Sequence, residues 1–309
     1  MTNVKKLGLT ALAGSLVATS AYAGALDVTG TAKVTYASLD ESEVTGNPWS
    51  MSQGIGFAGS GDLDIGTLSY TYTSTNMAFS SSNLKLDMGD TGTLSFANGA
   101  SLTGMQAYYD KMPTAGEQVW DDLDGQANGV ASMSTTNTLG YSNTFAGIGI
   151  SAAYNKDAGA STEGSSTSLA LTSAGLIDGA EIGWAHADVS GSTDNNGTDS
   201  DTVYLTYTAG AVTAGIQLTQ IDKSAANSDV DRTHAAVSVA VNENLSVSLG
   251  QSVVEFEATG KDDQESVGLA FSYTMGSMTI AGFQNSEDNS GGTQGTDDSV
   301  TELSVAFAF

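Results

Sequence analysis

The chain has 309 residues, of which 14% are charged, 40% are hydrophobic and none is cysteine. Soluble domains average about 25% charged residues, and here 9 Lys and Arg stand against 35 Asp and Glu, for a formal net charge of −26. The lack of a basic surface excludes nucleic-acid binding. The lack of cysteine excludes disulfide scaffolds, thiolate zinc sites and iron–sulfur clusters.

The first 23 residues have the three parts of a secretory signal peptide. Lys5 and Lys6 supply positive charge, residues 7–18 are apolar, and Ala21-Tyr22-Ala23 fits the small-residue cleavage rule. The alternative is an N-terminal membrane anchor, which is disfavoured because the apolar part is shorter than the ~20 residues a spanning helix needs. We expect a signal peptide at 1–23 and a single exported domain at 24–309.

Apolar residues alternate with small or polar ones in many later segments. The alternation is clearest in 26–36, 235–241, 245–249, 267–275 and 303–309. Successive side chains of a strand point to opposite faces, so each segment has one apolar face and one face of mostly Ser, Thr, Gly and Ala. No later segment has 18 consecutive apolar residues, so the sequence predicts no transmembrane helix.

Short and long connections alternate between the predicted strands. The short turns are expected at 64–66, 90–92, 145–147, 175–179, 209–211, 242–244 and 275–277. The long connections are expected at 37–48, 76–82, 98–136, 155–165, 189–201, 222–231, 257–265 and 286–298. Fifteen connections join sixteen strands. Both prolines, Pro48 and Pro113, fall in long connections, as expected because proline lacks the N–H that a strand ladder needs.

This asymmetry favours an outer-membrane barrel over a soluble sandwich. Long loops at one end and short turns at the other are typical of such barrels, whereas sandwich strands usually keep charged residues on their outer face. A closed sheet also pairs every backbone polar group within the hydrocarbon. The sequence therefore predicts an all-β fold, a 16-stranded antiparallel transmembrane β-barrel with long external loops, short periplasmic turns and an aqueous lumen.

Four segments resemble the Gram-negative general porins, and the alphaproteobacterial type most closely. They are the first strand Leu26-Asp27-Val28-Thr29-Gly30, the hairpin 57–66, the segment Asp110-Lys111-Met112-Pro113-Thr114 and the closing strand that ends in Phe309. The resemblance implies a third loop that folds into the barrel and narrows it, and passive diffusion of small hydrophilic solutes and ions. It also implies a homotrimer in the outer membrane of a Gram-negative bacterium, in contact with lipid and lipopolysaccharide.

The longest connection, 98–136, is the predicted constriction loop. If it folds inward, its acids line the constriction: Asp110, Glu117, Asp121, Asp122 and Asp124. Strand phase points three bases into the lumen on the opposing wall: Lys33, Lys85 and Arg232. Rings of charge set ion selectivity in a pore. Because bases are few, we expect a weak preference for cations. The alternatives are that the acids are only solvated, and that the bases serve solubility or pair with lipid headgroups.

Most of the remaining acids lie in the other long connections and predict a negative outer surface. We expect no cofactor, although a divalent cation such as Ca²⁺ at these acidic loops is an alternative, since carboxylates are its preferred ligands. No stretch has the twelve-residue calcium-loop spacing, and no metal site is predicted. Only two histidines, His186 and His234, are present, and neither has a nucleophile at a readable spacing.

Two other classes of protein remain open beside the channel. A secreted acidic β-rich surface protein, S-layer or adhesin-like, fits the composition but predicts a short strict repeat. An enzyme in a barrel of eight to twelve strands predicts a compact cluster of His, Ser and acids. The sequence favours a channel without enzymatic activity.

Overall fold

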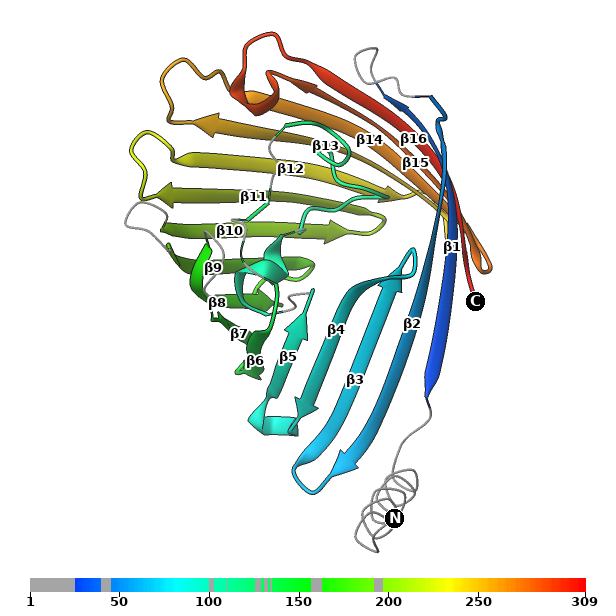
Figure 1. The fold of residues 1–309 in the computed structure, drawn as a ribbon, viewed down its shortest axis with the longest axis vertical. Helices are drawn as coiled ribbons and strands as arrows, with labels where there is room; N and C mark the ends of the chain where they lie inside the picture. The colour runs from blue at the N-terminus through cyan, green and yellow to red at the C-terminus, as the bar shows by residue number, and fades with distance from the viewer. Residues whose placement is uncertain are drawn as a thin grey trace, which may run out of the picture.

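The computed structural model describes residues 26–39, 46–99, 103–109, 111–125, 129–130, 133, 135–156, 163–191 and 197–309. In this part of the chain, sixteen strands form one closed antiparallel barrel (Figure 1). Each strand pairs with its neighbours in sequence, and β1 pairs with β16. The predicted fold class is confirmed. The segment 1–23 that was predicted as a signal peptide lies outside the described residues.

Thirteen of the sixteen strands have ten or more residues, which is long enough to cross a bilayer when tilted, and the other three have six to eight. The first eight are β1 (Asp27–Leu39), β2 (Trp49–Leu63), β3 (Gly66–Thr75), β4 (Ala78–Asp87), β5 (Thr93–Asn98), β6 (Thr138–Phe145), β7 (Ile148–Asn155) and β8 (Glu163–Ala174). The last eight are β9 (Ala180–Gly191), β10 (Thr198–Ala209), β11 (Val212–Lys223), β12 (Val230–Ala240), β13 (Leu245–Phe256), β14 (Gln264–Met275), β15 (Met278–Asp288) and β16 (Asp298–Ala308). Three short 3₁₀ helices are η1 (Gly89–Thr91), η2 (Gly104–Tyr108) and η3 (Ser290–Gly292). No helix in the described ranges is long and apolar enough to cross a membrane.

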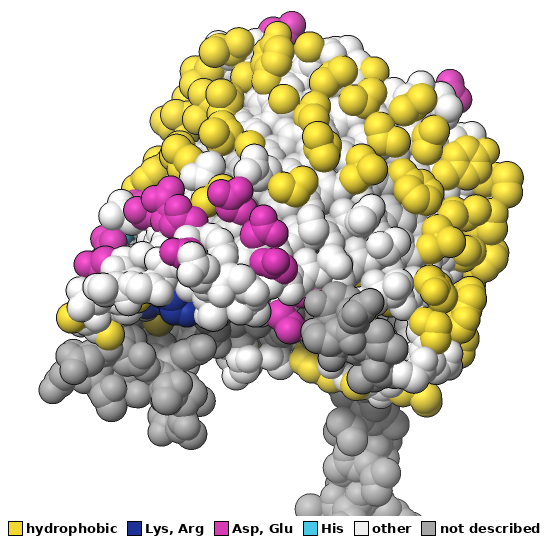
Figure 2. All heavy atoms as spheres, turned by 90° about the horizontal axis from the view of Figure 1, so that it is seen from above, with side chains coloured by type: hydrophobic (Ala, Val, Ile, Leu, Met, Phe, Trp, Pro, Cys, Tyr) yellow, Lys and Arg dark blue, Asp and Glu magenta, His cyan; other side chains and the backbone are white. Residues whose placement is uncertain are grey.

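The alternation of the sequence sorts side chains between the two faces of the wall. On β1, Val34 and Tyr36 point outward and are exposed, whereas Thr35 between them is 9% exposed and faces the interior. Figure 2 shows apolar side chains spread over the outer face, with acidic side chains gathered along one margin. The sheet therefore has the apolar exterior and polar interior of a barrel that lies in lipid.

One predicted connection is wrong. The third and fourth strands were expected to be joined by a long polar loop at 76–82, but a two-residue turn, Asn76–Met77, joins them. Both turn residues have positive φ, 51° and 64°, as a tight hairpin of this twist requires. The Ser-rich stretch that follows belongs to β4, where the Ser81 and Thr73 hydroxyls lie 2.6 Å apart across the ladder. A bulge between Thr73 and Ser74 accommodates the shift in register.

The barrel closes at its C-terminal residue. The backbones of Gly30 and Phe309 exchange two hydrogen bonds, with N···O distances of 2.7 and 2.9 Å. The Phe309 ring covers Gly30 so closely that a Cβ there would lie 2.4 Å from it. Because Gly30 has no side chain, the Phe309 ring can pack on the backbone of β1 where this strand pairs with β16.

Candidate functional site

The described residues of the segment between β5 and β6 occupy the interior of the barrel (Figure 1). We call this segment, residues 99–137, the internal loop. Its described residues bond to side chains on the inner faces of many strands, from β7 round to β16 and on to β1. The predicted inward fold of the third long connection is confirmed. The loop lies against one side of the wall, and the inner face of β2–β4 lies on the other side.

The helix η2, in the first part of the loop, packs against β7, β8 and β9. The Ser151 and Ser168 hydroxyls accept hydrogen bonds from the backbone N–H groups of Gly104 and Met105, at 3.0 and 3.2 Å. Gly104 has a φ of +64°, and a Cβ there would lie 2.0 Å from the Ser168 hydroxyl. Short hydroxyl side chains on the wall and a glycine in the loop thus allow the two backbones to approach closely.

Two tyrosines fix the next part of the loop. Tyr108 is 2% exposed, donates a hydrogen bond of 2.6 Å to the carbonyl of Leu171, and packs edge to face on Tyr204 at 4.9 Å. Burial raises the pKa of the Tyr108 phenol above its ordinary value, so the phenol keeps its proton. Tyr204 in turn donates to the Glu181 carboxylate at 2.5 Å. Lys111 lies 3.8 Å from the same carboxylate and 5.3 Å from each tyrosine ring centroid. This base is therefore held by one acid and two aromatic rings.

The middle of the loop packs on glycines of the wall. A Cβ on Gly250 or on Gly268 would lie 2.8 or 2.9 Å from the Val119 side chain, so only glycine leaves room for it. Trp120 stacks edge to face on His234, with ring centroids 4.6 Å apart, and both side chains are buried. His234 is therefore a packing residue beneath the loop.

The far end of the loop is attached to β15 and β16. The Asn285 amide, 2% exposed, donates to the carbonyls of Gln118 and Asp121 at 2.9 and 3.1 Å. The backbone N–H of Asp124 donates to an Asp298 carboxylate oxygen at 2.7 Å. These bonds satisfy loop backbone groups that would otherwise be buried without partners.

The structure places four of the five predicted constriction acids in this loop. Glu117, Asp122 and Asp124 are exposed. Asp121 is half-buried and accepts a hydrogen bond of 2.6 Å from the N–H of Gln118. Asp110 lies outside the described residues.

The three predicted wall bases all point into the barrel, but they lie in different surroundings. Lys33 lies 2.9 Å from Glu302 and 3.9 Å from Glu117. Arg232 is partly buried and donates to the carbonyl of Val130 in the loop at 3.2 Å. Lys85 pairs in register with Ser95, which is 8% exposed and faces the interior. It therefore lies on the wall away from the part of the loop that packs on β7–β16.

Sequence reasoning missed the interior acids that contact the loop or the lumen-facing bases. These acids are Glu181, Glu287, Asp298 and Glu302. Their signal was present, since each shares a strand face with small polar residues and period-two alternation places that face inside. Their partners could not be found in this way, because the pairing depends on the path of the loop.

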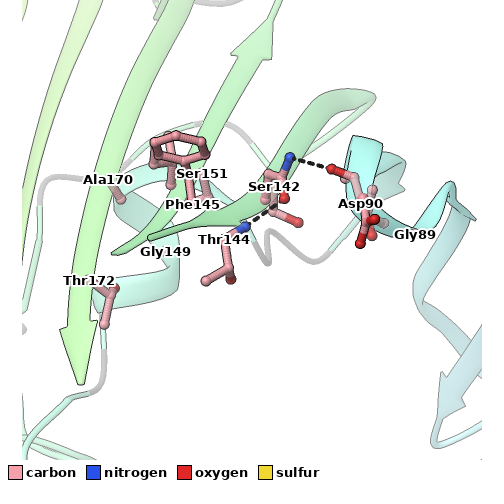
Figure 3. A pocket seen from close by; sticks show the side chains of 13 residues that line it. Gly89, Asp90, Ser142, Thr144, Phe145, Gly149, Ser151, Ala170 and Thr172 are labelled. Atoms are coloured by element: carbon pink, nitrogen blue, oxygen red, sulfur yellow. Dashed lines mark hydrogen bonds between the residues drawn. The ribbon is translucent and has the colours of Figure 1, made fainter. Parts of the chain in front are cut away.

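A cavity of about 710 Å³ opens where the short turns 88–92 and 146–147 meet the interior. Figure 3 shows Ser142, Thr144, Ser151 and Thr172 around it, with a single charged side chain, Asp90. The Asn143 amide donates to the Asp90 carbonyl at 3.2 Å and fixes η1 against β6. This end of the channel is lined mainly by uncharged hydroxyl and amide groups. No three His, Asp or Glu side chains of the described ranges lie close enough together to hold a metal ion.

Comparison with known proteins gives a family and a fold. A family model described as Gram-negative porin matches residues 8–309. Among solved structures, a porin refined at 1.8 Å resolution superposes with a TM-score of 0.70 at 16% identity, covering 92% of this chain and 100% of that one. A mutant of the Rhodopseudomonas blastica porin gives 0.65 at 14% identity, with 92% and 100% coverage. OmpT, an outer membrane protein of Vibrio cholerae, gives 0.65 at 11% identity, with 92% and 97% coverage. A search of curated protein sequences found no match to this chain.

Proposed function

Because the chain belongs to the Gram-negative porin family and forms an outer-membrane porin channel, we propose that it passes small hydrophilic solutes and ions with a preference for cations. The family and the fold point to a channel rather than an enzyme. The proposed cation preference rests on one observation. The lumen-facing bases are mostly paired or covered, whereas three acids of the internal loop are exposed.

The bases that face the lumen are largely neutralised or covered. Lys33 is paired with Glu302, and Lys111 with Glu181. Arg232 lies beneath the loop carbonyl of Val130. A permeating anion would therefore find few free positive charges in the described part of the interior, where Lys85 is the lumen-facing base that has neither an ion pair nor a hydrogen bond to a described residue.

The acids of the internal loop are placed differently. Glu117, Asp122 and Asp124 expose their side chains, and only Glu117 is near a base, at 3.9 Å from Lys33. Exposed acids in a narrow aqueous passage raise the local concentration of cations and lower that of anions. We propose that these three residues, with Asp110 and Asp121, form the acidic side of the constriction, and that Lys33, Lys85 and Arg232 form its weakly basic side.

The test is the reversal potential of single channels in a planar bilayer under a tenfold KCl gradient. We expect discrete conductance steps and a reversal potential that favours potassium over chloride. The variant Glu117→Gln/Asp122→Asn/Asp124→Asn should move the reversal potential toward zero.

A matched control removes the same charge from the external connection after β13, with Glu257→Gln/Asp262→Asn/Asp263→Asn. This control should keep the wild-type reversal potential at high salt, where charges more than about 3 Å from the ion path are screened. Chloride preference in the wild type would refute the proposed selectivity and leave the channel standing.

We also propose that the chain is a homotrimer and that its first 23 residues are removed on export. The described outward-facing side chains of β1–β4 carry no charge. They include aromatic pairs, such as Tyr36 with Trp49 and Phe57 with Tyr72, whose ring centroids are 5.2 and 6.3 Å apart. An uncharged, aromatic outer face suits contact with another copy of the chain. Native mass spectrometry of the detergent-solubilised protein tests the oligomer, and N-terminal sequencing tests cleavage after Ala23.

A further inference from the structure

A groove of about 560 Å³ crosses the outer face of the barrel between β9 and β13. Part of its lining is apolar, because the side chains of Trp184, Val203 and Leu218 point outward and are 40 to 46% exposed. These three residues and Thr233 pair in register and form one row across four neighbouring strands. The groove therefore has an apolar floor on the face of the wall that contacts lipid.

The rim of the groove on the long-loop side is polar. It is the next outward-facing row of the sheet, and its members are again directly opposite one another from β9 to β13: His186, Asp201, Gln220, Asp231 and Glu255. The three acids of this row line the groove and are exposed. Charge on the outer face costs little near the water interface and much at the bilayer midplane, so this rim lies at the level of the lipid headgroups.

The negative charge of the rim is not balanced by bases on the same face. None of the outward-facing side chains that the structure describes on β9–β13 is Lys or Arg. His186 lies 3.2 Å from an Asp201 carboxylate oxygen, and no ion pair of the described residues includes Asp231 or Glu255. A lipid in this groove therefore meets negative charge at its headgroup and apolar side chains along its alkyl chain.

We propose that this groove binds a lipid of the outer leaflet that has a positively charged amine headgroup. The alkyl chain lies along Trp184, Val203 and Leu218, and the ammonium group meets the carboxylates of Asp201 and Asp231. An ammonium is a compact positive charge with several N–H donors, and it is also attracted by the face of an indole ring. The proposal concerns the outer wall and does not depend on the ion selectivity of the lumen.

An amine fits the rim better than a metal ion that bridges it to an anionic lipid. Neighbouring strands are about 4.8 Å apart, so the backbones of Asp201 and Asp231, with the neutral Gln220 between them, are about 10 Å apart. No three His, Asp or Glu side chains in the described part of the chain lie close enough together to hold a metal ion. Without such a bridge, the rim repels the phosphate groups of an anionic lipid.

The test is quenching of Trp184 fluorescence in phosphatidylcholine vesicles that contain a minor fraction of a lipid with brominated chains. The headgroup of this lipid is either a cationic primary amine or an anionic phosphoglycerol. Trp184→Phe gives the signal of the other tryptophans, which is subtracted. We expect the amine lipid to quench Trp184 at a mole fraction about fivefold lower than the phosphoglycerol lipid, because one charge at a membrane surface contributes roughly that factor.

The variant Asp201→Asn/Asp231→Asn removes two charges from the rim with little change in shape and should abolish this preference. The matched control Glu265→Gln/Asp288→Asn removes two exposed, directly opposite acids of β14 and β15, which do not line the groove, and should keep it. If the rim variant does not fold into vesicles, Thr233→Phe, which fills the groove with a ring, should remove the preference in its place.

Three results would overturn the proposal. One is equal quenching by the two lipids in the wild type. Another is an equal loss of preference in the rim variant and in the control, because attraction to an acidic barrel as a whole would then explain it. The third is a preference for the anionic lipid that requires Ca²⁺ and disappears with EDTA. Single-channel conductance should be the same in the rim variant and in the wild type, so failure of this proposal leaves the channel standing.

Discussion

The substitution Asn285→Ala tests whether the internal loop is held by specific hydrogen bonds to the wall. The Asn285 amide makes two bonds to loop carbonyls at 2.9 and 3.1 Å and is 2% exposed. Each bond contributes about 0.5–1.5 kcal/mol net, so losing both should weaken attachment of the loop by about 1–3 kcal/mol.

This loss should appear in local opening of the loop and not in unfolding of the barrel. The barrel ladders do not depend on Asn285, whereas the segment from Gln118 to Asp124 is attached to β15 and β16 by few bonds. A weakening of 1–3 kcal/mol corresponds to an opening equilibrium shifted about 5- to 150-fold. Hydrogen exchange at the N–H of Asp121, which bonds to the Gln118 carbonyl at 3.1 Å, should accelerate by that factor.

The matched control for this substitution is Ser286→Ala, the next residue, whose side chain is exposed on the outer face. Exchange in the control should equal that of the wild type. Equal exchange at Asp121 in Asn285→Ala and in the wild type would refute the reasoning, because the two bonds would then contribute nothing to loop attachment.

Three further substitutions test other contacts. Lys33→Met leaves the buried Glu302 without its partner and should lower the unfolding free energy in lipid vesicles by about 1–3 kcal/mol. The double variant with Glu302→Gln should recover this stability, and no recovery would count against the pair. Gly104→Ala should speed exchange at the Met105 N–H, because its Cβ meets the Ser168 hydroxyl, while Gly116→Ala, which meets only Ala270 at 3.6 Å, should not. Gly30→Val should slow barrel closure on folding into vesicles, because it displaces the Phe309 ring, and Gly59→Val, with nothing within 4 Å, should fold at the wild-type rate.

The strands could be predicted because their physical signal is local. Alternation with a period of two survives in a single sequence, and it placed Lys33, Lys85 and Arg232 on the inner face without any knowledge of their partners. The same signal failed at 76–82, where a run of serines has no apolar face to alternate with. There the β4 ladder is supported by hydroxyl contacts such as that between Thr73 and Ser81, which composition alone cannot distinguish from a loop.

The path of the internal loop could not be predicted, because it depends on complementary surfaces far apart in the sequence. Val119 fits where Gly250 and Gly268 leave space, and Asn285 meets the carbonyls of a segment more than 160 residues earlier. The same holds for charge. The sequence alone indicates that Lys33 is an unpaired base on the wall. In the structure its Nζ lies 2.9 Å from a carboxylate oxygen of Glu302, on the strand that closes the barrel.

Charged side chains are distributed unevenly over the outer face of the barrel, and this distribution indicates where lipid contacts the wall. Near the long-loop ends of β9–β15, outward-facing acids lie directly opposite one another, as in the pairs Asp188 with Asp199, Asp231 with Glu255 and Glu265 with Asp288. Such pairs are destabilising in hydrocarbon and cost little at the water interface, so this row marks the upper limit of lipid contact on that side. The described outward side chains of β1–β4 include no such row, and Trp49 and Phe79 lie close to the same end of the barrel. An apolar wall that continues to this height is better matched by a neighbouring barrel than by lipid headgroups, which is why the proposed trimer contact belongs on β1–β4.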